Sequence, residues 1–285
     1  MYESYWQLFG TPFENAGDGR WFAETAVHGE ALARLEFLVE YRRRIGLFRG
    51  AEGTGKSTIL QQLLRRRKRY QQEETAFIDL TSMESHELLW HLAAGLHLGP
   101  NDSDTPLQLW RSLDDALNGL RYAGRQTVFL FDHFDPRQQD VLRVVERLQH
   151  LESALSGWVT TIIAIRNDGS LERMNSLVEL SDFRIELQPL DQKQTSAYIQ
   201  ELLKQAGAQQ QIFVEEASAQ IHQYSGGIPR EINRICDFAL LAAMQEQRRT
   251  IDEEIVSTVA EELQFQSFSD GERIGSQELT DASVR

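Results

Sequence analysis

The stretch "IGLFRGAEGTGKSTIL", Ile45–Leu60, joins a short apolar segment to a glycine-rich turn and then to a helical pattern. Within it, "GAEGTGKS" fits G-x-x-x-x-G-K-[ST] and lies where that motif is needed, between a strand and a helix. Glycines let the backbone amides wrap a phosphate, and the helix N-terminus adds a favourable dipole. The motif therefore predicts a phosphate-binding loop (P-loop) for ATP or ADP with Mg²⁺. Lys56 is expected at the β- and γ-phosphates and Ser57 on the metal. The predicted nucleotide contacts are Gly50, Ala51, Glu52, Gly53, Thr54, Gly55, Lys56, Ser57 and Thr58.

A second motif, "TVFLFDHFDP" at Thr127–Pro136, places an aspartate at the end of an apolar strand. In P-loop proteins such an aspartate completes the magnesium site, so Asp132 is a predicted metal residue. A glutamate would follow it if the site activated water as usual, but the chain has His133. A ring nitrogen does not occupy the place of a glutamate oxygen, and a displacement of about 1 Å can cost about 10²-fold in rate. The motif predicts good ATP binding and slow hydrolysis.

Strand and helix patterns alternate on both sides of these motifs. Further short apolar strands are expected at Thr75–Leu80, Trp158–Ile165 and Phe183–Leu187, separated by helices of ten residues or more. This alternation predicts an α/β fold, a three-layer P-loop core with about five parallel strands. After Pro189 only helical patterns follow, which indicates a small all-helical C-terminal domain. The predicted domains are 1–27 (N-terminal segment near the nucleotide site), 28–189 (α/β core), 190–265 (helical lid) and 266–285 (disordered tail).

The composition narrows the class of protein. The 285 residues carry a net charge of −14 with a pI of about 5.0, which globally opposes binding to nucleic acid and acidic membranes. Neither a secretory signal nor an apolar run of about 20 residues is recognisable, so a soluble cytoplasmic protein is expected. The single cysteine, Cys236, excludes a disulfide framework and a cysteine-rich zinc site, and its helical context predicts a core position.

The P-loop, the Asp132 strand and "SGGIPREINRICDFALLAA" (Ser225–Ala243) together resemble the AAA+ ATPases of the general secretion pathway protein A, or ExeA-like, type. The resemblance covers about Tyr5 to Leu263. It implies a five-stranded nucleotide-binding domain with a helical lid and ATPase activity. The family includes proteins linked to secretin and type IV pilus assembly, so self-association or a protein partner in an envelope or secretion assembly is implied.

The resemblance also implies roles for residues outside the P-loop. Arg230 matches the lid arginine that senses the γ-phosphate, and Asn167 or Asp168 matches the polar residue that watches the attacking water. Pro12, Phe13 and His28 match a segment near the adenine. Two departures from the family pattern are notable: His133 replaces the catalytic glutamate, and Leu180 aligns with the arginine that a neighbouring subunit inserts. The nearby Arg184 lies within a predicted strand.

Two basic runs, Arg42–Arg44 and Arg65–Arg69, leave an alternative open. Cations favour the C-terminal end of a helix, so a solvated helix end explains the runs without a ligand. They could instead form a phosphate-binding patch, as in DNA-associated ATPases of the transposition-helper or initiator kind. Three functions therefore remain: a nucleotide-dependent switch or assembly factor, which we favour, a DNA-associated ATPase, and an ATP-binding scaffold without turnover.

Overall fold

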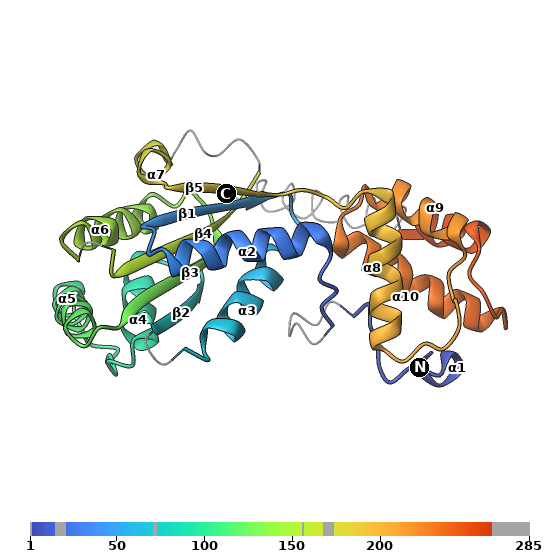
Figure 1. Ribbon diagram of the computed structural model, residues 1–285, viewed down its shortest axis with the longest axis horizontal. Coiled ribbons are helices and arrows are strands. Elements are labelled where there is room, and N and C mark those ends of the chain that lie inside the picture. Colours follow the sequence, from blue (N-terminus) through green and yellow to red (C-terminus); the bar gives the residue numbers. More distant parts are fainter. Residues whose placement is uncertain (1, 15–20, 71–72, 156, 168–173, 264–285) are drawn as a thin grey trace, which may run out of the picture. The chain divides into compact units, whose positions relative to one another are not determined.

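The computed structural model describes residues 2–14, 21–70, 73–155, 157–167 and 174–263. Asp168 and the tail predicted at 266–285 lie outside the described residues. Contacts divide the chain into two units (Figure 1). Ala26–Gln188 form an α/β unit, and the N-terminal segment up to Thr25 joins the chain from Pro189 onward in a helical unit. The predicted segment 1–27 thus contributes to both units, because α2 begins at Ala26.

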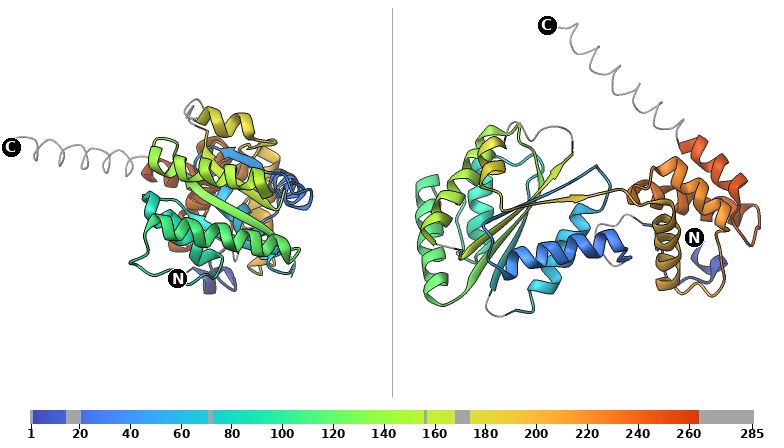
Figure 2. Two further views of the ribbon diagram at one scale, coloured as in Figure 1. Left: turned by 90° about the vertical axis from the view of Figure 1, so that its left-hand side faces the viewer. Right: turned by 45° about the horizontal axis from the view of Figure 1, so that its top comes forward.

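The α/β unit is built on one five-stranded parallel sheet with the order β2-β3-β4-β1-β5 (Figures 1 and 2). Its strands are β1 (Ile45–Gly50), β2 (Glu73–Asp79), β3 (Gln126–Phe134), β4 (Val159–Arg166) and β5 (Phe183–Leu187). The order places β4 between the P-loop strand β1 and the strand β3 that carries Asp132. This sheet confirms the predicted α/β fold.

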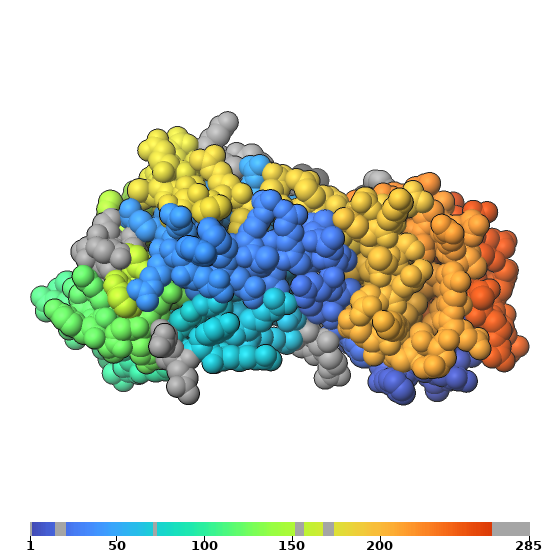
Figure 3. All heavy atoms as spheres, viewed as in Figure 1, coloured from blue at the N-terminus to red at the C-terminus, as the bar shows by residue number. Residues whose placement is uncertain are grey.

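The helices of the α/β unit are α2 (Ala26–Glu40), α3 (Lys56–Arg67), α4 (Ser85–Gly95), α5 (Pro106–Tyr122), α6 (Gln139–Leu155) and α7 (Asn175–Leu180). They cover both faces of the sheet, and the side chains along each strand alternate between two apolar clusters. Leu47 and Phe131 belong to the cluster with α4, α5 and α6, whereas Phe48 and Leu130 belong to the cluster with α2 and α3. Figure 3 shows α2 and α3 side by side on their face. The sequence did not predict α7, because six residues are too few to show a helical period.

Three strands differ from their predicted bounds. β4 (Val159–Arg166) is shifted by one residue from the predicted Trp158–Ile165. β2 begins at Glu73 rather than Thr75, because Glu73 and Glu74 pair with Arg67 and Arg125. β3 extends past Asp132 to Phe134 through a register shift between Phe131 and Phe134. His133 lies within this bulge with φ +54°, in the left-handed region that non-glycine residues rarely occupy. The bulge turns Phe134 into the same apolar cluster as Phe131.

The helical unit contains α8 (Gln192–Gln205), α9 (Glu215–Ser225), α10 (Pro229–Gln245) and a further helix at 253–263. A short N-terminal helix, α1 (Glu3–Trp6), is fastened to it by side-chain hydrogen bonds. The Tyr5 hydroxyl donates to the Arg248 carbonyl at 2.7 Å and Trp6 Nε1 to the Leu240 carbonyl at 3.1 Å. Among the described residues, no helix is long and apolar enough to cross a membrane.

Gly226 and Gly227 make the turn between α9 and α10. Both have positive φ, and a Cβ on Gly227 would lie 1.9 Å from the Leu190 carbonyl oxygen. Only glycine fits there, since the backbone at Leu190 cannot move away as a flexible side chain could. Pro229 then occupies the first turn of α10, where its missing N–H costs nothing. The turn therefore determines where Arg230 stands, in the first turn of this helix.

Candidate nucleotide-binding site

The P-loop runs from Gly50 at the end of β1 to Lys56 at the start of α3, as its motif predicts. Gly53 and Gly55 have φ of +80° and +98°, which glycine adopts without strain. A Cβ on Gly50 would lie 2.9 Å from both the Leu187 carbonyl oxygen and the Thr54 hydroxyl. These glycines therefore permit a tight turn that side chains would fill, the cradle that a phosphate group requires.

Within the loop, Lys56 folds back onto its own backbone. Lys56 Nζ donates to the carbonyls of Gly50 at 2.8 Å and Ala51 at 2.9 Å. The Thr54 hydroxyl, almost fully buried, donates to the same Ala51 carbonyl at 2.8 Å. The ammonium group is thus held over the mouth of the loop, where it can exchange carbonyl contacts for phosphate oxygens.

The N-terminal residues expected near the adenine separate between the two units. His28, in the first turn of α2, is buried with Nε2 3.2 Å from the Thr54 carbonyl oxygen, so it supports the P-loop. Pro12 and Phe13 lie in the helical unit, and both are buried. The Phe13 ring packs edge-on against Phe213 at 6.2 Å between centroids. A direct contact of Pro12 or Phe13 with a nucleotide stays a prediction.

Asp132 has the position expected of a magnesium residue. Its side chain is 2% exposed, and its Oδ1 accepts a hydrogen bond from the His133 backbone N–H at 2.9 Å. Leu130, two residues earlier on β3, packs on the α3 side of the sheet, so Asp132 projects toward the face that carries Ser57. Oxygen donors of this kind suit Mg²⁺. Among the described residues, no cluster of three or more His, Cys, Asp or Glu side chains could hold a metal ion.

His133 contacts an acidic residue that the sequence analysis did not single out. Its Nδ1 lies 3.0 Å from Asp79 Oδ1, at the tip of β2, and 3.7 Å from Asp132 Oδ2. Asp79 is oriented by Thr81, whose backbone N–H and hydroxyl donate to Oδ1 at 3.0 and 2.7 Å. Burial alone would raise the pKa of Asp79, but hydrogen bonds from Thr81 and His133 outweigh it and lower this pKa. The sequence does contain a signal for Asp79, because this aspartate ends the strand pattern "TAFID" as Asp132 ends its own apolar run.

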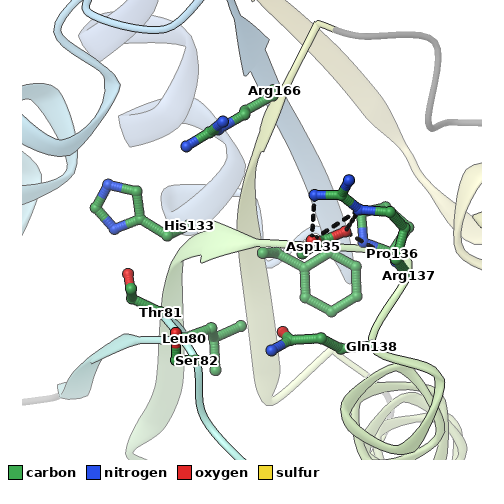
Figure 4. Close-up of a pocket in the computed structure, with 10 residues that line it drawn as sticks. Leu80, Thr81, Ser82, His133, Asp135, Pro136, Arg137, Gln138 and Arg166 are labelled. Atoms are coloured by element: carbon green, nitrogen blue, oxygen red, sulfur yellow. Dashed lines mark hydrogen bonds and ion pairs between the residues drawn. The ribbon is translucent and has the colours of Figure 1, made fainter. Parts of the chain in front are cut away.

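A hollow of about 220 Å³ opens beside His133 at the tips of the central strands (Figure 4). Its lining comes from the ends of β3 and β4 and from the turn after β2, and includes Thr81, Ser82, His133, Asp135, Arg137 and Arg166. Arg137 binds the Asp135 carboxylate with distances of 2.7 to 3.0 Å, and these hydrogen bonds are the main reason why the pKa of Asp135 is lowered. Asp135 is therefore committed to Arg137 and does not replace a glutamate at position 133.

The remaining predicted site residues stand at two places. Asn167 follows β4, where its backbone N–H donates to the Gly50 carbonyl at 3.2 Å and its side chain donates to Glu186 at 3.1 Å. Position 167 therefore lies directly beside the start of the P-loop. Arg230 lies in the first turn of α10, exposed, in the helical unit. Its contact with a γ-phosphate stays a prediction.

The basic runs take part in the protein's own ion pairs. Arg67 is 4% exposed and pairs with Glu73 and with Glu40, the latter at 3.7 Å. Arg66 pairs with Glu36 at 3.2 Å, and the guanidinium of Arg42 stacks over Trp158 at 3.9 Å. In the strand β5, Arg184 donates to the Val178 carbonyl at 3.1 Å. Arg66 and Arg67 thus join the end of α3 to α2 and to β2, which gives these two residues of the longer run a structural role.

The sequence is similar to that of known proteins over the α/β unit and beyond it. Residues 39–174 match the family described as AAA domain. The chain is 31% identical over 271 residues to general secretion pathway protein A of Aeromonas hydrophila, which covers 92% of this chain. The chain spans only 48% of the length of that relative.

Solved structures share the fold at low identity. Cdc6p from Pyrobaculum aerophilum matches with a TM-score of 0.70 and 18% identity, covering 88% of this chain and 70% of that one. The Aeropyrum pernix ORC1 protein, solved in complex with DNA, matches with a TM-score of 0.70 and 14% identity over 89% and 68% of the two chains. The Aeropyrum pernix ORC2 protein, solved as ADPNP-ADP complexes, matches with a TM-score of 0.68 and 14% identity over 88% and 71%. With the P-loop and the strand order, these similarities show that the chain has a P-loop nucleotide-binding fold, matches the AAA domain over residues 39–174 and is similar to general secretion pathway protein A over most of its own length.

Proposed function

We propose that this protein is an AAA+ ATPase that acts as a nucleotide-dependent switch or assembly factor, binds Mg·ATP and Mg·ADP, and hydrolyses ATP slowly by itself. The observation that carries the proposal is the histidine beside Asp132. At position 133 an imidazole stands where hydrolysis would call for a flexible carboxylate, and its Nδ1 is engaged with Asp79 at 3.0 Å. The two nearby carboxylates are committed as well, Asp79 to Thr81 and His133, and Asp135 to Arg137.

The nucleotide part of the proposal rests on the P-loop. Gly50, Gly53 and Gly55 leave room for a phosphate, Lys56 supplies a cation at the mouth, and Ser57 and Asp132 supply oxygen ligands for Mg²⁺. When bound, the metal would neutralise charge on the phosphates. Asn167 beside Gly50 is the proposed residue that watches the attacking water. Arg230 in the helical unit is the proposed sensor of the γ-phosphate. Under this proposal the helical unit would respond to the nucleotide state, since Arg230 would contact a group that only ATP has.

The proposed target is a protein, either a second copy of this chain or a component of an envelope or secretion assembly. The supporting observation is the relative named general secretion pathway protein A. A DNA-binding role receives less support, because Arg66 and Arg67 of the longer basic run are engaged with Glu36, Glu40 and Glu73. A cytoplasmic location stays a prediction.

The test measures steady-state phosphate release in saturating Mg·ATP. Wild type is expected well below about 1 s⁻¹, the lower end of ordinary enzymes. His133→Glu should raise the rate and leave ATP affinity nearly unchanged. In that variant the new carboxylate faces Asp79, and like charges at this distance repel, so Asp79→Asn added to His133→Glu should raise the rate further.

The matched control is His91→Glu, the same exchange at an exposed position of α4. It should leave the rate unchanged. Turnover by wild type at about 1 s⁻¹ or more, with no gain from either the single or the double variant, would contradict slow hydrolysis.

A further inference from the structure

Arg166 is a cation at the phosphate cradle to which neither the motifs nor the comparisons assign a role. It is the last residue of β4, and the sheet register pairs it with Gly50, the first residue of the P-loop. Ile162 and Ala164, four and two residues earlier, pack on the side of α2 and α3. Because side chains alternate along a strand, Arg166 projects toward the same side as the P-loop helix and Asp132.

The partner of Arg166 belongs to the P-loop itself. Its Nη1 lies 3.2 Å from Oε2 of Glu52, the third residue of the loop motif. Both side chains are more than half exposed, at 58% and 54%, so this ion pair is weak and readily exchanged. A glutamate at the mouth of a phosphate cradle would otherwise repel the phosphates. The ion pair therefore neutralises the negative charge of Glu52 and keeps the guanidinium of Arg166 beside the P-loop.

The guanidinium of Arg166 is also oriented toward the reacting end of the site. In Figure 4 it extends from the tip of β4 to the same side of the hollow as the His133 ring. A second arginine of this hollow, Arg137, differs because its guanidinium is bound in a fork by the carboxylate of Asp135. Within the described lining of the hollow, Arg166 is thus the arginine whose ion-pair partner lies in the P-loop.

We propose that Arg166 binds the outermost phosphate of ATP from within the same chain, and that Glu52 holds it aside until ATP arrives. This inference rests on the proposed nucleotide binding at Gly50–Ser57. An arginine fork matches the oxygens of a phosphate and binds them with charge-assisted hydrogen bonds. ADP lacks the terminal group, so Arg166 would distinguish the two nucleotides. When ATP binds, the Glu52 carboxylate would lose its ion pair with Arg166, so the charge on the P-loop surface would change with the bound nucleotide.

The experiment measures dissociation constants by calorimetry for the slowly hydrolysed analogue ATPγS and for ADP, each with Mg²⁺, so that no turnover is needed. Arg166→Ala should weaken ATPγS about 10- to 100-fold, the usual range for hydrogen bonds to a charged group. ADP should change less than twofold. Glu52→Gln should tighten ATPγS more than ADP, because the carboxylate that competes for Arg166 is gone and only ATPγS offers Arg166 a third phosphate. Arg137→Ala is the control at the same hollow and should alter neither constant.

The double variant Glu52→Gln with Arg166→Ala tests the exchange directly. If Glu52 acts only by holding Arg166, the gain from Glu52→Gln disappears when Arg166 is absent, and the double variant binds as Arg166→Ala does. An unchanged gain in the double variant would overturn the restraining role of Glu52. Suppose that wild type binds both nucleotides. The phosphate contact would then be overturned if Arg166→Ala changed the dissociation constants of ATPγS and ADP equally, or changed neither. If wild type binds neither nucleotide, the proposed function itself fails and this inference falls with it.

Discussion

Removal of the P-loop lysine should separate the intrinsic stability of the α/β unit from the stability that a nucleotide adds. The perturbation is Lys56→Ala. A ligand that binds only the folded state stabilises it by RT ln(1 + [L]/Kd), about 2.7 kcal/mol at a hundredfold excess over Kd. For a unit of this size, 1 kcal/mol shifts Tm by about 2–4 °C, so wild type should gain roughly 5–11 °C with Mg·ADP or Mg·ATP.

Without nucleotide, the variant loses two hydrogen bonds, from Lys56 Nζ to the carbonyls of Gly50 and Ala51 at 2.8 and 2.9 Å. Hydrogen bonds from charged groups are strong, but both carbonyls can accept water instead once the side chain is gone. The net cost should therefore be about 1 kcal/mol, a fall of about 2–4 °C in Tm. The nucleotide-dependent gain should disappear, because the cation that reaches the phosphates is missing.

The assay is thermal unfolding of the full-length protein, monitored by circular dichroism, with and without nucleotide and Mg²⁺. The matched control is Lys68→Ala, which removes the same side chain from an exposed position at the other end of α3 and should keep the full gain. A wild-type melt that does not move in saturating nucleotide would refute the site. A full gain in Lys56→Ala would refute the role given to this lysine.

Four further outcomes are expected. Arg230→Ala should weaken ATPγS more than ADP in the same calorimetric assay, and equal losses would return Arg230 to a surface role. Binding of DNA in gel shifts should be weak or absent at physiological salt, because the net charge is −14; a salt-dependent shift that Lys68→Ala with Arg69→Ala abolishes would instead favour the DNA-associated function. Gly227→Ala should destabilise the helical unit by about 3 kcal/mol or more in urea unfolding, since its Cβ would lie 1.9 Å from the Leu190 carbonyl oxygen at φ +73°. Burial raises the pKa of the Cys236 thiol well above its usual value, so an aromatic disulfide reagent should label it only in denaturant, and rapid labelling of the native protein would contradict its core position.

The sequence by itself determined the features whose signals are local. The P-loop motif lies within eight consecutive positions, Gly50–Ser57, and its flanking strand and helix are visible as periodic apolar patterns. The parallel α/β architecture followed from the alternation of such patterns, and Asp132 from its place at a strand end. The glycine pair and proline before Arg230 likewise predict a turn and a helix start, because backbone conformation at these residues depends on their own chemistry.

Only the tertiary structure decided what each strand tip contacts, because strand order brings together residues that are far apart along the chain. Asp79 meets His133 since β2 and β3 are neighbours in the sheet, and Arg166 reaches Glu52 since β4 is inserted beside β1. The bulge at His133 depends on Phe134 packing into the apolar cluster, which no short window of sequence reveals. Arg67 reads as a solvated cation in its basic run, but the neighbouring start of β2 buries it against Glu73. Periodicity and motif spacing report the chemistry of neighbours in sequence, whereas contacts between strand tips depend on the free energy of packing the whole sheet.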